Sequence, residues 1–393
     1  MATTVEHDIE ELIERIEDLL EEHRIDEIRD LVNRIRPQDI IDILERLDAD
    51  SRRKFLSLIP SHYYIEMLSK LSDDTLYEAV IVKGVSKIAR ILADMPPDEI
   101  ADILERLPVK TRRQVLALLP PWKMTEVVEL MKYPPESAGG VMTTRIPVFS
   151  KEETVGRALE KYVIKYQLGL YDKVNNAYIV DSHGRLVGVV DLRTLMMVPK
   201  NKKIGDIAQP PPVKVHVLAD REEAARLVVK YDLMEIPVVD DQDRILGAIT
   251  VDDIIDVIVA ESTEDILKFG GLIETVKGSY LTAKITDLVK RRATWLIILY
   301  ILESITVTVI SRFEAMIASV VALSFFIPLL TDTGGNTGSQ AATLVIRSLA
   351  TGEARPGDFT RIIIKELISS SLLAVIVAPI GFTISYALSL IHI

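Results

Sequence analysis

The stretch that decides the fold of the middle of the chain is YIVDSHGRLVGVVDLRTLM, residues 178 to 196, which returns as PVVDDQDRILGAITVDDII at residues 237 to 255. Each copy starts with β-branched residues, passes through a polar turn, continues as a second apolar run around a glycine and ends in a helical pattern. A further helical pattern precedes each copy, at residues 154 to 166 and 221 to 233. The duplication therefore predicts two β-α-β-β-α repeats in tandem.

A different repeat precedes this region. The segment PQDIIDILERLDADSRRKFLSLIP, residues 37 to 60, matches PDEIADILERLPVKTRRQVLALLP, residues 97 to 120. Proline stands at both ends of each copy, and apolar residues recur at helical spacing between them. Each copy predicts a helical hairpin that buries its apolar face by stacking on its neighbours. We therefore expect an all-α, superhelical domain over residues 1 to 135.

The C-terminal part is apolar. Three segments, residues 293 to 311, 314 to 330 and 367 to 391, are candidate membrane spans. A membrane span needs about 20 apolar residues. The first and third segments are long enough to cross the membrane alone, and the second is long enough if it continues through the glycines that follow. Basic residues precede the first segment and lie between the second and third, which predicts that residues 1 to 292 are cytosolic. We expect an α-helical, multi-pass domain in the cell (inner) membrane over residues 293 to 393; core helices of a soluble protein are the alternative.

The second apolar segment runs into PLLTDTGGNTGSQAATLVIRSLATGE, residues 328 to 353. We expect the proline to interrupt the helix and the glycines to permit unwinding or close approach. Irregular backbone at membrane depth is tolerated only where it is buried in protein or lines a polar cavity. An ion pathway and close helix packing both remain open. The candidates for lining a pathway are Pro328, Asp332, Gly335, Asn336 and Gln340.

The formal net charge is −12, and nearly all of the excess acid lies in residues 1 to 292. An acidic surface argues against nucleic acid as a partner and favours cations. The chain has no cysteine, which excludes disulfides, thiolate metal sites and a cysteine nucleophile. The acidic, amphipathic N-terminus has no apolar run and is not typical of a secretory signal.

A cluster of acids follows the second β-α-β-β-α copy, in VDDIIDVIVAESTEDI, residues 251 to 266. On a helix, Asp253, Asp256 and Glu264 fall within roughly 80° of one another. Asp252, Glu261 and Asp265 lie on nearby flanks. Carboxylates this close repel one another unless a cation intervenes, and Mg²⁺ is suited to them because it prefers oxygen ligands and retains water. A solvated helix face is the alternative.

The duplicated middle region resembles a tandem pair of CBS domains, with SAGGVMTTRIPVF, residues 137 to 149, as the lead-in to the first. The order of an acidic helical domain, a CBS pair and FFIPLLTDTGGNTGSQAATLVIRSLATGE resembles the MgtE family of magnesium channels over essentially the whole chain. The resemblance implies CBS domains at residues 136 to 202 and 203 to 262. It also implies a connecting helix at residues 263 to 292 that acts as a plug. The amphipathic pattern and basic end of residues 272 to 295 predict that this segment lies at the membrane surface; a simple linker is the alternative.

The resemblance further implies a homodimer whose cytosolic domains bind intracellular Mg²⁺ and close the pore when Mg²⁺ is plentiful. The ion-bridging residues carried over from the family are Asp98, Asp102, Asp220, Asp232, Asp253, Asp256, Glu261, Glu264 and Asp265. Some members of the family also accommodate ATP at the CBS pair. Asp253 stands near a possible ribose position, although it is also a candidate for Mg²⁺.

Two features depart from the family. The family pore uses five spans, whereas three are expected here, so either further spans are missing from the sequence or the pore is completed in another way. Glu303 and Asp332 are carboxylates within or at the edge of the membrane, where such groups are costly and are suspected of function. We expect Asp332 to face the pathway and Glu303 to make either a helix-to-helix hydrogen bond or a dimer contact.

Two other classes of function are alternatives to a channel. One is a membrane-anchored sensor of Mg²⁺ or nucleotide that does not itself conduct. The other is an enzyme, for which the sequence offers neither a G-x-S-x-G nor an H-E-x-x-H motif and only six scattered histidines. We therefore expect a transporter and not an enzyme.

Overall fold

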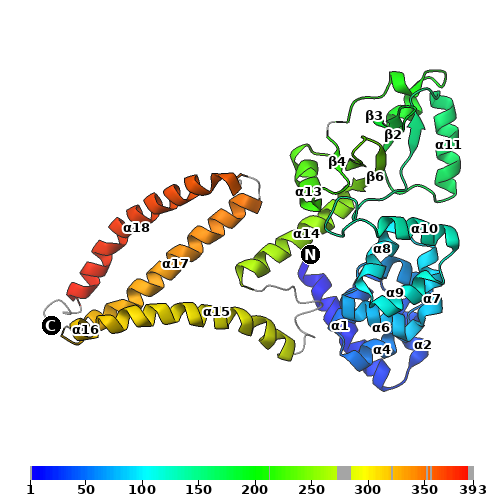
Figure 1. Ribbon diagram of the computed structural model, residues 1–393. Coiled ribbons are helices and arrows are strands. Elements are labelled where there is room, and N and C mark those ends of the chain that lie inside the picture. Colours follow the sequence, from blue (N-terminus) through cyan, green and yellow to red (C-terminus); the bar gives the residue numbers. More distant parts are fainter. Residues whose placement is uncertain are drawn as a thin grey trace. The chain divides into compact units, whose positions relative to one another are not determined.

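The computed structural model describes residues 2–211, 213–271, 285–319, 322–350, 353–354 and 356–387. The described residues divide into two compact units (Figure 1). The N-terminal unit extends to Ser262, and the C-terminal unit begins at Thr263 and contains the long helices from Ile285 onward.

The helical domain opens the N-terminal unit, coloured blue to cyan in Figure 1. Its helices are α1 (Ala2–Glu21), α2 (Ile25–Val32), α3 (Pro37–Arg46), α4 (Ala49–Leu58), η1 (Ser61–Tyr63), α5 (Tyr64–Met67), α6 (Asp73–Lys83), α7 (Val85–Ala93), α8 (Pro97–Arg106), α9 (Val109–Leu116) and α10 (Pro121–Leu130). The two predicted hairpins are confirmed as α3 with α4 and α8 with α9. Proline occupies the first turn of α3, α8 and α10, where its missing N–H has no helical partner.

The middle of the chain forms the two predicted β-α-β-β-α repeats, the first and second CBS repeat. The first consists of β1 (Val148–Ser150), α11 (Val155–Gln167), β2 (Asn176–Val180), β3 (Leu186–Asp191) and α12 (Leu192–Met197), followed by η2 (Ile204–Asp206). The second consists of β4 (Val215–His216), α13 (Arg221–Lys230), β5 (Glu235–Val239), β6 (Ile245–Thr250) and α14 (Val251–Phe269). In each sheet the middle strand pairs parallel with the first strand and antiparallel with the third. The tandem repeat predicted from the duplication is confirmed.

The glycine inside the third strand of each repeat is required by close packing. A Cβ at Gly247 would lie 2.4 Å from the carbonyl oxygen of Thr143, and one at Gly188 would lie 2.8 Å from the Cβ of Ala208. In both places an incoming segment pairs with the strand, through the bridges Thr143 to Ala248 and Val189 to Gln209. The two glycines therefore admit a further backbone at the sheet edge.

The helical domain and the second CBS repeat share one hydrophobic core. It runs from Ile100 and Leu104 of α8 through Met142 to Ile254 and Val257 of α14, together with many other buried residues. The first CBS repeat has a core of its own. A small cluster that includes Tyr178, Val239 and Ala248 joins the two repeats. Because the shared core is continuous, α8 and α14 are positioned by packing and not by linkers alone.

The C-terminal unit contains α15 (Ile285–Arg312), α16 (Glu314–Ser319), α17 (Ala322–Ala350), η3 (Pro356–Asp358) and α18 (Phe359–Ala387). Two stretches of the described residues, Leu288–Arg312 and Phe359–Thr383, are long and apolar enough to cross a membrane. Their most apolar windows bury no residue within the chain, so their apolar surface is free for lipid or for other helices. These stretches contain the first expected span and most of the third; the crossing of the second stays a prediction.

The expected interruption of the helix at Pro328 is wrong, and the glycines do not unwind it; close helix packing at the glycines stays a prediction. Helix α17 is continuous from Ala322 to Ala350 with Pro328 inside it. Within this helix Thr331 donates its hydroxyl hydrogen to the carbonyl oxygens of Ile327 and Pro328, at 2.9 and 3.0 Å. One proline removes a single backbone donor, and three glycines cost about 1 kcal/mol each, so a helix of 29 residues can retain its form.

The expected connecting helix is described only in part. Helix α14 continues to Phe269, and α15 begins at Ile285, so residues 263–269 and 285–292 are helical. Residues 272–284 lie outside the described part, as do residues 388–391 of the third expected span.

Candidate cation site

A pocket of about 350 Å³ lies between α8 of the helical domain and α14 of the second CBS repeat. Its lining consists of Ser69, Asp98, Glu99, Asp102, Glu105, Arg106, Pro135, Val141, Arg221, Asp253, Asp256, Val257 and Ala260. Six of these side chains are carboxylates and two are guanidinium groups. The pocket therefore concentrates negative charge where two parts of the chain meet.

Helix α8 directs its acids to the pocket because its opposite face is anchored. Ile100, Ile103 and Leu104 are fully buried in the shared core. Asp98, Asp102 and Glu105 follow at intervals of four and three residues, so they share the other face of the helix. Asp98 lies in the first turn, where the positive end of the helix dipole favours a negative charge.

Helix α14 contributes the facing acids in the same manner. Ile254 and Val257 are buried, which turns Asp253 and Asp256 toward the pocket. Thr250, at the end of β6, donates its hydroxyl hydrogen to Oδ2 of Asp253 at 2.7 Å. This hydrogen bond fixes the orientation of the Asp253 carboxylate, a group that sequence spacing alone leaves free to rotate.

The pocket raises the pKa values of Asp98, Asp102 and Asp253. Burial raises the pKa of Asp98 well above its usual value, and the charges of Asp172 and Asp253 raise it further. Burial, followed by the charges of Glu105 and Asp253, raises the pKa of Asp102 to about 7, although this side chain still reaches solvent. Burial is also the main reason why the pKa of Asp253 rises to about 6. The carboxylates of α8 and α14 thus oppose one another's ionisation across the pocket.

One acceptor in this pocket is unsatisfied. The Oδ1 atom of Asp98 is shielded from solvent and has no hydrogen-bond partner in the structure. A buried carboxylate oxygen without a partner is costly, and a cation or a water bound to a cation would satisfy it. Among the described residues, no three acids or histidines converge closely enough to ligate one ion directly. The pocket therefore fits an ion that keeps part of its water shell, as Mg²⁺ does.

The two guanidinium groups have partners in the protein. Arg106 donates to Oδ1 of Asp73 at 2.8 Å and to the carbonyl oxygens of Ser69 and Leu71, so it is tied to the helical domain. Arg221, at the start of α13, forms an ion pair with Glu261 of α14 at 2.9 Å. Both arginines are thus committed to particular acids, and the pocket retains excess negative charge.

The structure brings together four of the nine predicted ion-bridging residues: Asp98, Asp102, Asp253 and Asp256 line the pocket. The other five do not line it. Asp220 caps α13 by accepting from the backbone N–H of Glu222 at 2.8 Å.

The remaining four of those five have other positions. Asp232 is exposed and adopts a positive φ of 51°. Glu261 is the partner of Arg221. Glu264 and Asp265 lie in the part of α14 that belongs to the C-terminal unit, where Glu264 pairs with Lys268.

Sequence reasoning missed three acids of this site. Glu99 and Glu105 line the pocket, and Glu105 was detectable because it follows Asp102 by three residues on the same helix face. Asp172, in the loop between α11 and β2, raises the pKa of Asp98, Glu99 and Asp253 in addition to burial. No signal in the sequence connects Asp172 with these residues, because only the fold of the first CBS repeat brings it near.

The residues predicted to line a pathway all lie on α17. Pro328, Asp332, Gly335, Asn336 and Gln340 are exposed within the chain. The amide of Asn336 donates to the Oδ2 atom of Asp332 at 3.2 Å, one turn away. Asp332, Asn336 and Gln340 recur every four residues and so form a polar stripe on the helix. Glu303 is exposed within α15.

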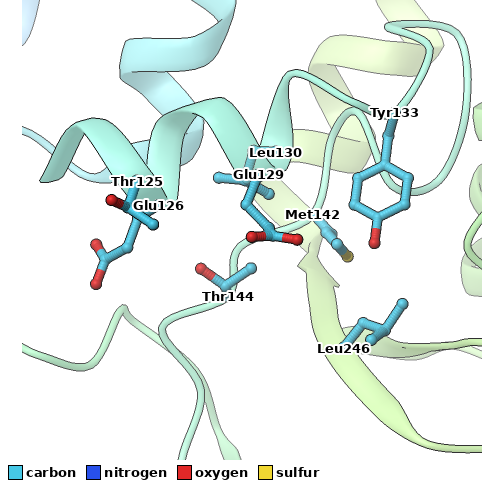
Figure 2. A pocket seen from close by; sticks show the side chains of 8 residues that line it. All are labelled: Thr125, Glu126, Glu129, Leu130, Tyr133, Met142, Thr144 and Leu246. Atoms are coloured by element: carbon cyan, nitrogen blue, oxygen red, sulfur yellow. The ribbon is translucent and has the colours of Figure 1, made fainter. Parts of the chain in front are cut away.

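A second pocket, of about 320 Å³, lies beside α10 and is drawn in Figure 2. Tyr133, Met142 and Leu246 supply much of its lining. Figure 2 shows the Glu129 carboxylate beside Met142, and this carboxylate is already paired with Lys132 at 2.9 Å. Two acids line this pocket, Glu126 and Glu129, against six in the first pocket. It is therefore a seam between the helical domain and the second CBS repeat without a comparable concentration of negative charge.

An acidic helical-repeat domain, a CBS pair and apolar helices long enough to cross a membrane define a membrane transport protein with a large region outside the bilayer. Comparison with known families agrees: the MgtE intracellular N domain matches residues 35–136, CBS domains match residues 138–201 and 204–260, and the divalent cation transporter domain named MgtE matches residues 327–392.

Individual relatives extend over most of the chain. The magnesium transporter MgtE of Thermus thermophilus is 33% identical over 96% of this chain and 83% of its own length. That of Bacillus subtilis is 31% identical over 92% of this chain and 79% of its own. A crystal structure of the cytosolic domain of the Mg²⁺ channel MgtE in complex with ATP is 31% identical, with a TM-score of 0.55, and covers 62% of this chain and 98% of that one.

The chain belongs to the MgtE family of magnesium transporters. Members of this family transport divalent cations across membranes, have a cytosolic N-terminal region and are not enzymes, which confirms the expected class.

Proposed function

We propose that this protein is a Mg²⁺-selective channel or transporter, spanning the membrane several times, whose conductance falls when intracellular Mg²⁺ occupies the pocket between α8 and α14. The observation that carries the proposal is the set of six carboxylates around one pocket, with the shielded Oδ1 atom of Asp98 lacking a partner. The raised pKa values of Asp98, Asp102 and Asp253 supply the physical reason, because acids that resist ionisation together ionise readily around a divalent cation.

Gating follows from the difference in ion affinity between two arrangements of the cytosolic region. With Mg²⁺ bound, the charges of Asp98, Asp102 and Asp253 are neutralised and α8 stays packed against α14. Without the ion, their repulsion favours separation. The equilibrium shifts only as far as Mg²⁺ binds one arrangement more tightly than the other. Five of the predicted ion-bridging residues do not line the pocket. They could bind Mg²⁺ only if the cytosolic region rearranges or a second copy of the chain approaches; they are Asp220, Asp232, Glu261, Glu264 and Asp265.

The transported ion follows the polar stripe of α17. Asp332, Asn336 and Gln340 offer a carboxylate and two amides on one side of a helix that is otherwise apolar over much of its length. Polar side chains within a membrane helix avoid lipid by facing a water-filled path or another helix. The continuous backbone of α17 means that side chains, and not unwound carbonyls, would line this path.

A homodimer is part of the proposal. Large apolar side chains are exposed on helices of both CBS repeats, among them Ile164 and Tyr166 of α11, Val229 of α13 and Val259 of α14. Exposed apolar surface of this kind marks a protein interface. A second copy of the chain would cover it, as the symmetry of most soluble assemblies suggests.

ATP is a second candidate ligand of the CBS pair. A related cytosolic domain has been crystallised with ATP. In this chain Asp253 already accepts a hydrogen bond from Thr250 and lines the acidic pocket, so a ribose hydroxyl at Asp253 would compete with a cation there.

Hydrogen exchange of the full-length protein in detergent, with and without Mg²⁺, tests the sensor. We expect millimolar Mg²⁺ to slow exchange in α8 and α14, and Asp253→Asn to raise the Mg²⁺ concentration needed for half protection by about tenfold or more. Asp252→Asn is the matched control, because Asp252 is the preceding residue, is exposed and does not line the pocket.

Equal shifts in the two variants, or no protection of the wild type, would contradict the proposed sensor. Mg²⁺ flux into proteoliposomes then separates a transporter from an anchored sensor, since only a transporter carries the ion. Unchanged ion selectivity in Asp332→Asn would count against the proposed path along α17.

A further inference from the structure

Arg221 stands at the edge of the acidic pocket with its side chain only 17% exposed. Its Nη2 atom lies 2.7 Å from Oε2 of Glu136 and 2.9 Å from Oε1 of Glu261, and its Nε atom also donates to that Glu261 oxygen at 2.9 Å. Glu136 lies in the segment that leaves the helical domain, and Glu261 lies on α14. One guanidinium group therefore joins two acids that are far apart in the sequence.

The backbone supports the same junction. The N–H of Arg221 donates to the carbonyl oxygen of Glu136 at 2.9 Å, and the N–H of Ala138 donates to that of Ala219 at 2.7 Å. The segment from 136 to 139 thus runs antiparallel to residues 217–221. Arg221 is placed where the exit from the helical domain crosses the second CBS repeat, and its side chain extends the junction to α14.

The two arginines of the pocket differ in what they connect. Arg106 binds Asp73 and two carbonyl oxygens of its own helical domain. Arg221 instead connects the domain exit with α14. A guanidinium group keeps its charge over the whole physiological pH range and presents several donors in a fixed plane, so it can bridge two carboxylates without an ion. Glu261 is in this way neutralised by the protein itself, whereas Asp98 is not.

We propose that Arg221 is a built-in cation of the pocket, which holds the exit of the helical domain against α14 through Glu136 and Glu261 when no divalent ion is bound. This inference rests on the proposed ion-sensing function and adds a positioning residue to it. Because one corner of the pocket is held by a permanent cation, the ion-free protein keeps its domain exit in place. Mg²⁺ binding then needs to hold together only the acids of α8 and the acids of α14 that line the pocket.

The test is hydrogen exchange of the full-length protein in detergent with a chelator of divalent ions. We expect Arg221→Gln to speed exchange of the Ala138 and Gly139 amides and of the α14 turn around Glu261 by about fivefold, the range of a partly buried ion pair. Saturating Mg²⁺ should reduce this difference, because ions around Asp253 and Asp256 hold α14 by other contacts. Arg226→Gln is the matched control: it lies on the same helix, is half exposed, and its nearest acid oxygen, on Glu222, is 4.0 Å away.

Exchanging the two charges separates an electrostatic role from simple packing. The double variant Arg221→Glu with Glu261→Arg rebuilds the pair in reverse, and the new arginine can also reach for Glu136, so slow exchange should return. The inference is overturned if, in chelator, the amides of Arg221→Gln exchange at the same rate as those of the wild type. Fast exchange that the charge reversal does not correct overturns it as well.

Failure of this inference is distinguishable from failure of the proposed function. If Mg²⁺ does not protect the wild type, ion sensing fails, while the role of Arg221 is still decided by the samples in chelator. If Mg²⁺ protects the wild type but Arg221→Gln is without effect in chelator, ion sensing stands and the built-in cation is rejected.

Discussion

Asp98, Asp102 and Asp253 keep their carboxyl groups near one another even though their charges repel. They cannot move apart easily, because Ile100, Leu104 and the other buried residues of α8, like Ile254 and Val257 of α14, fix the two helices in one core. Packing thus maintains an unfavourable arrangement of charge, which protonation relieves and which, in the proposed function, a bound cation would relieve as well.

At this scale we predict that Mg²⁺ binding weakens as the pH falls. The pKa of Asp102 is raised to about 7 and that of Asp253 to about 6, so at pH 6 much of the pocket is protonated and cannot bind an ion. The Mg²⁺ concentration for half protection in hydrogen exchange should rise by about tenfold between pH 8 and pH 6.

In the protein without a bound ion, a fall in pH has the opposite effect: it stabilises the packed state. Raised pKa values mean that the packed state binds more protons than the separated one. Its extra stability is therefore present at low pH and is lost as the pH rises through about 6 and about 7. Thermal unfolding in chelator should thus occur at a higher temperature at pH 5.5 than at pH 8. A pH-independent Mg²⁺ midpoint would exclude these acids as ligands.

At the scale of elements, the two copies of the helical hairpin show that a shared motif does not determine the role of its acids. Helices α3 and α8 share the acids at equivalent positions, Asp42 with Asp102 and Glu45 with Glu105. In α3, Glu45 accepts from the backbone N–H of Ser72 at 2.9 Å, whereas Glu105 of α8 lines the pocket. The same spacing gives a structural acid in one copy and a candidate ion site in the other, because α8 packs beside α14.

The CBS repeats allow a prediction about glycine. Gly247→Ala should destabilise the protein by about 2 kcal/mol, because its Cβ would meet the Thr143 carbonyl oxygen at 2.4 Å and the Met142 sulfur at 2.9 Å, in backbone that cannot yield easily. Chemical unfolding in detergent measures the change. Gly184→Asp is the matched control: Gly184 has φ of 78° in open space, and the equivalent position of the second repeat is Asp243 with φ of 60°. If both variants unfold alike, close packing is not the reason for Gly247.

At the scale of the whole molecule, one continuous core packs the helical domain against the second CBS repeat, while the long helices of the C-terminal unit bury little within the chain. In the proposed sensor, α14 is the element that would carry the state of the acids onward, because it is one continuous helix from Val251 to Phe269. The unburied apolar helices require lipid and other helices to complete a pathway.

For the whole protein we predict that removing the sensor charges abolishes control of flux but not flux. The double variant Asp98→Asn with Asp102→Asn should carry the same Mg²⁺ flux at high and at low internal Mg²⁺, because asparagine removes both the ion ligands and the charge repulsion between α8 and α14. In the wild type, the proposed sensor should lower the flux at high internal Mg²⁺. This variant keeps the shared core, whereas deleting residues 2–135 would expose it. Flux assays on proteoliposomes loaded with different Mg²⁺ concentrations measure the effect. Flux that stays sensitive to internal Mg²⁺ would contradict the role of these acids.

Much of the fold could be predicted because its helices and strands follow from the periodic pattern of residues along the chain. The hairpin prolines, the strand-turn-strand pattern around Gly188 and Gly247, and the acid spacing of α14 each predicted an element that the structure contains. The expected break at Pro328 is wrong because a proline only lowers the stability of a helix, and a long helix can tolerate the loss of one backbone hydrogen bond.

The sequence by itself determined the order of domains, the repeats, the excess of acid before residue 293 and the candidate spans, because each depends on neighbours along the chain. Only the tertiary structure decided which acids share a pocket. Asp98 and Asp253 are far apart in the chain, Asp172 comes from a third region, and Glu261 is taken by Arg221. Repulsion, burial and pairing depend on distance in space, and that distance is set by the packing of the shared core.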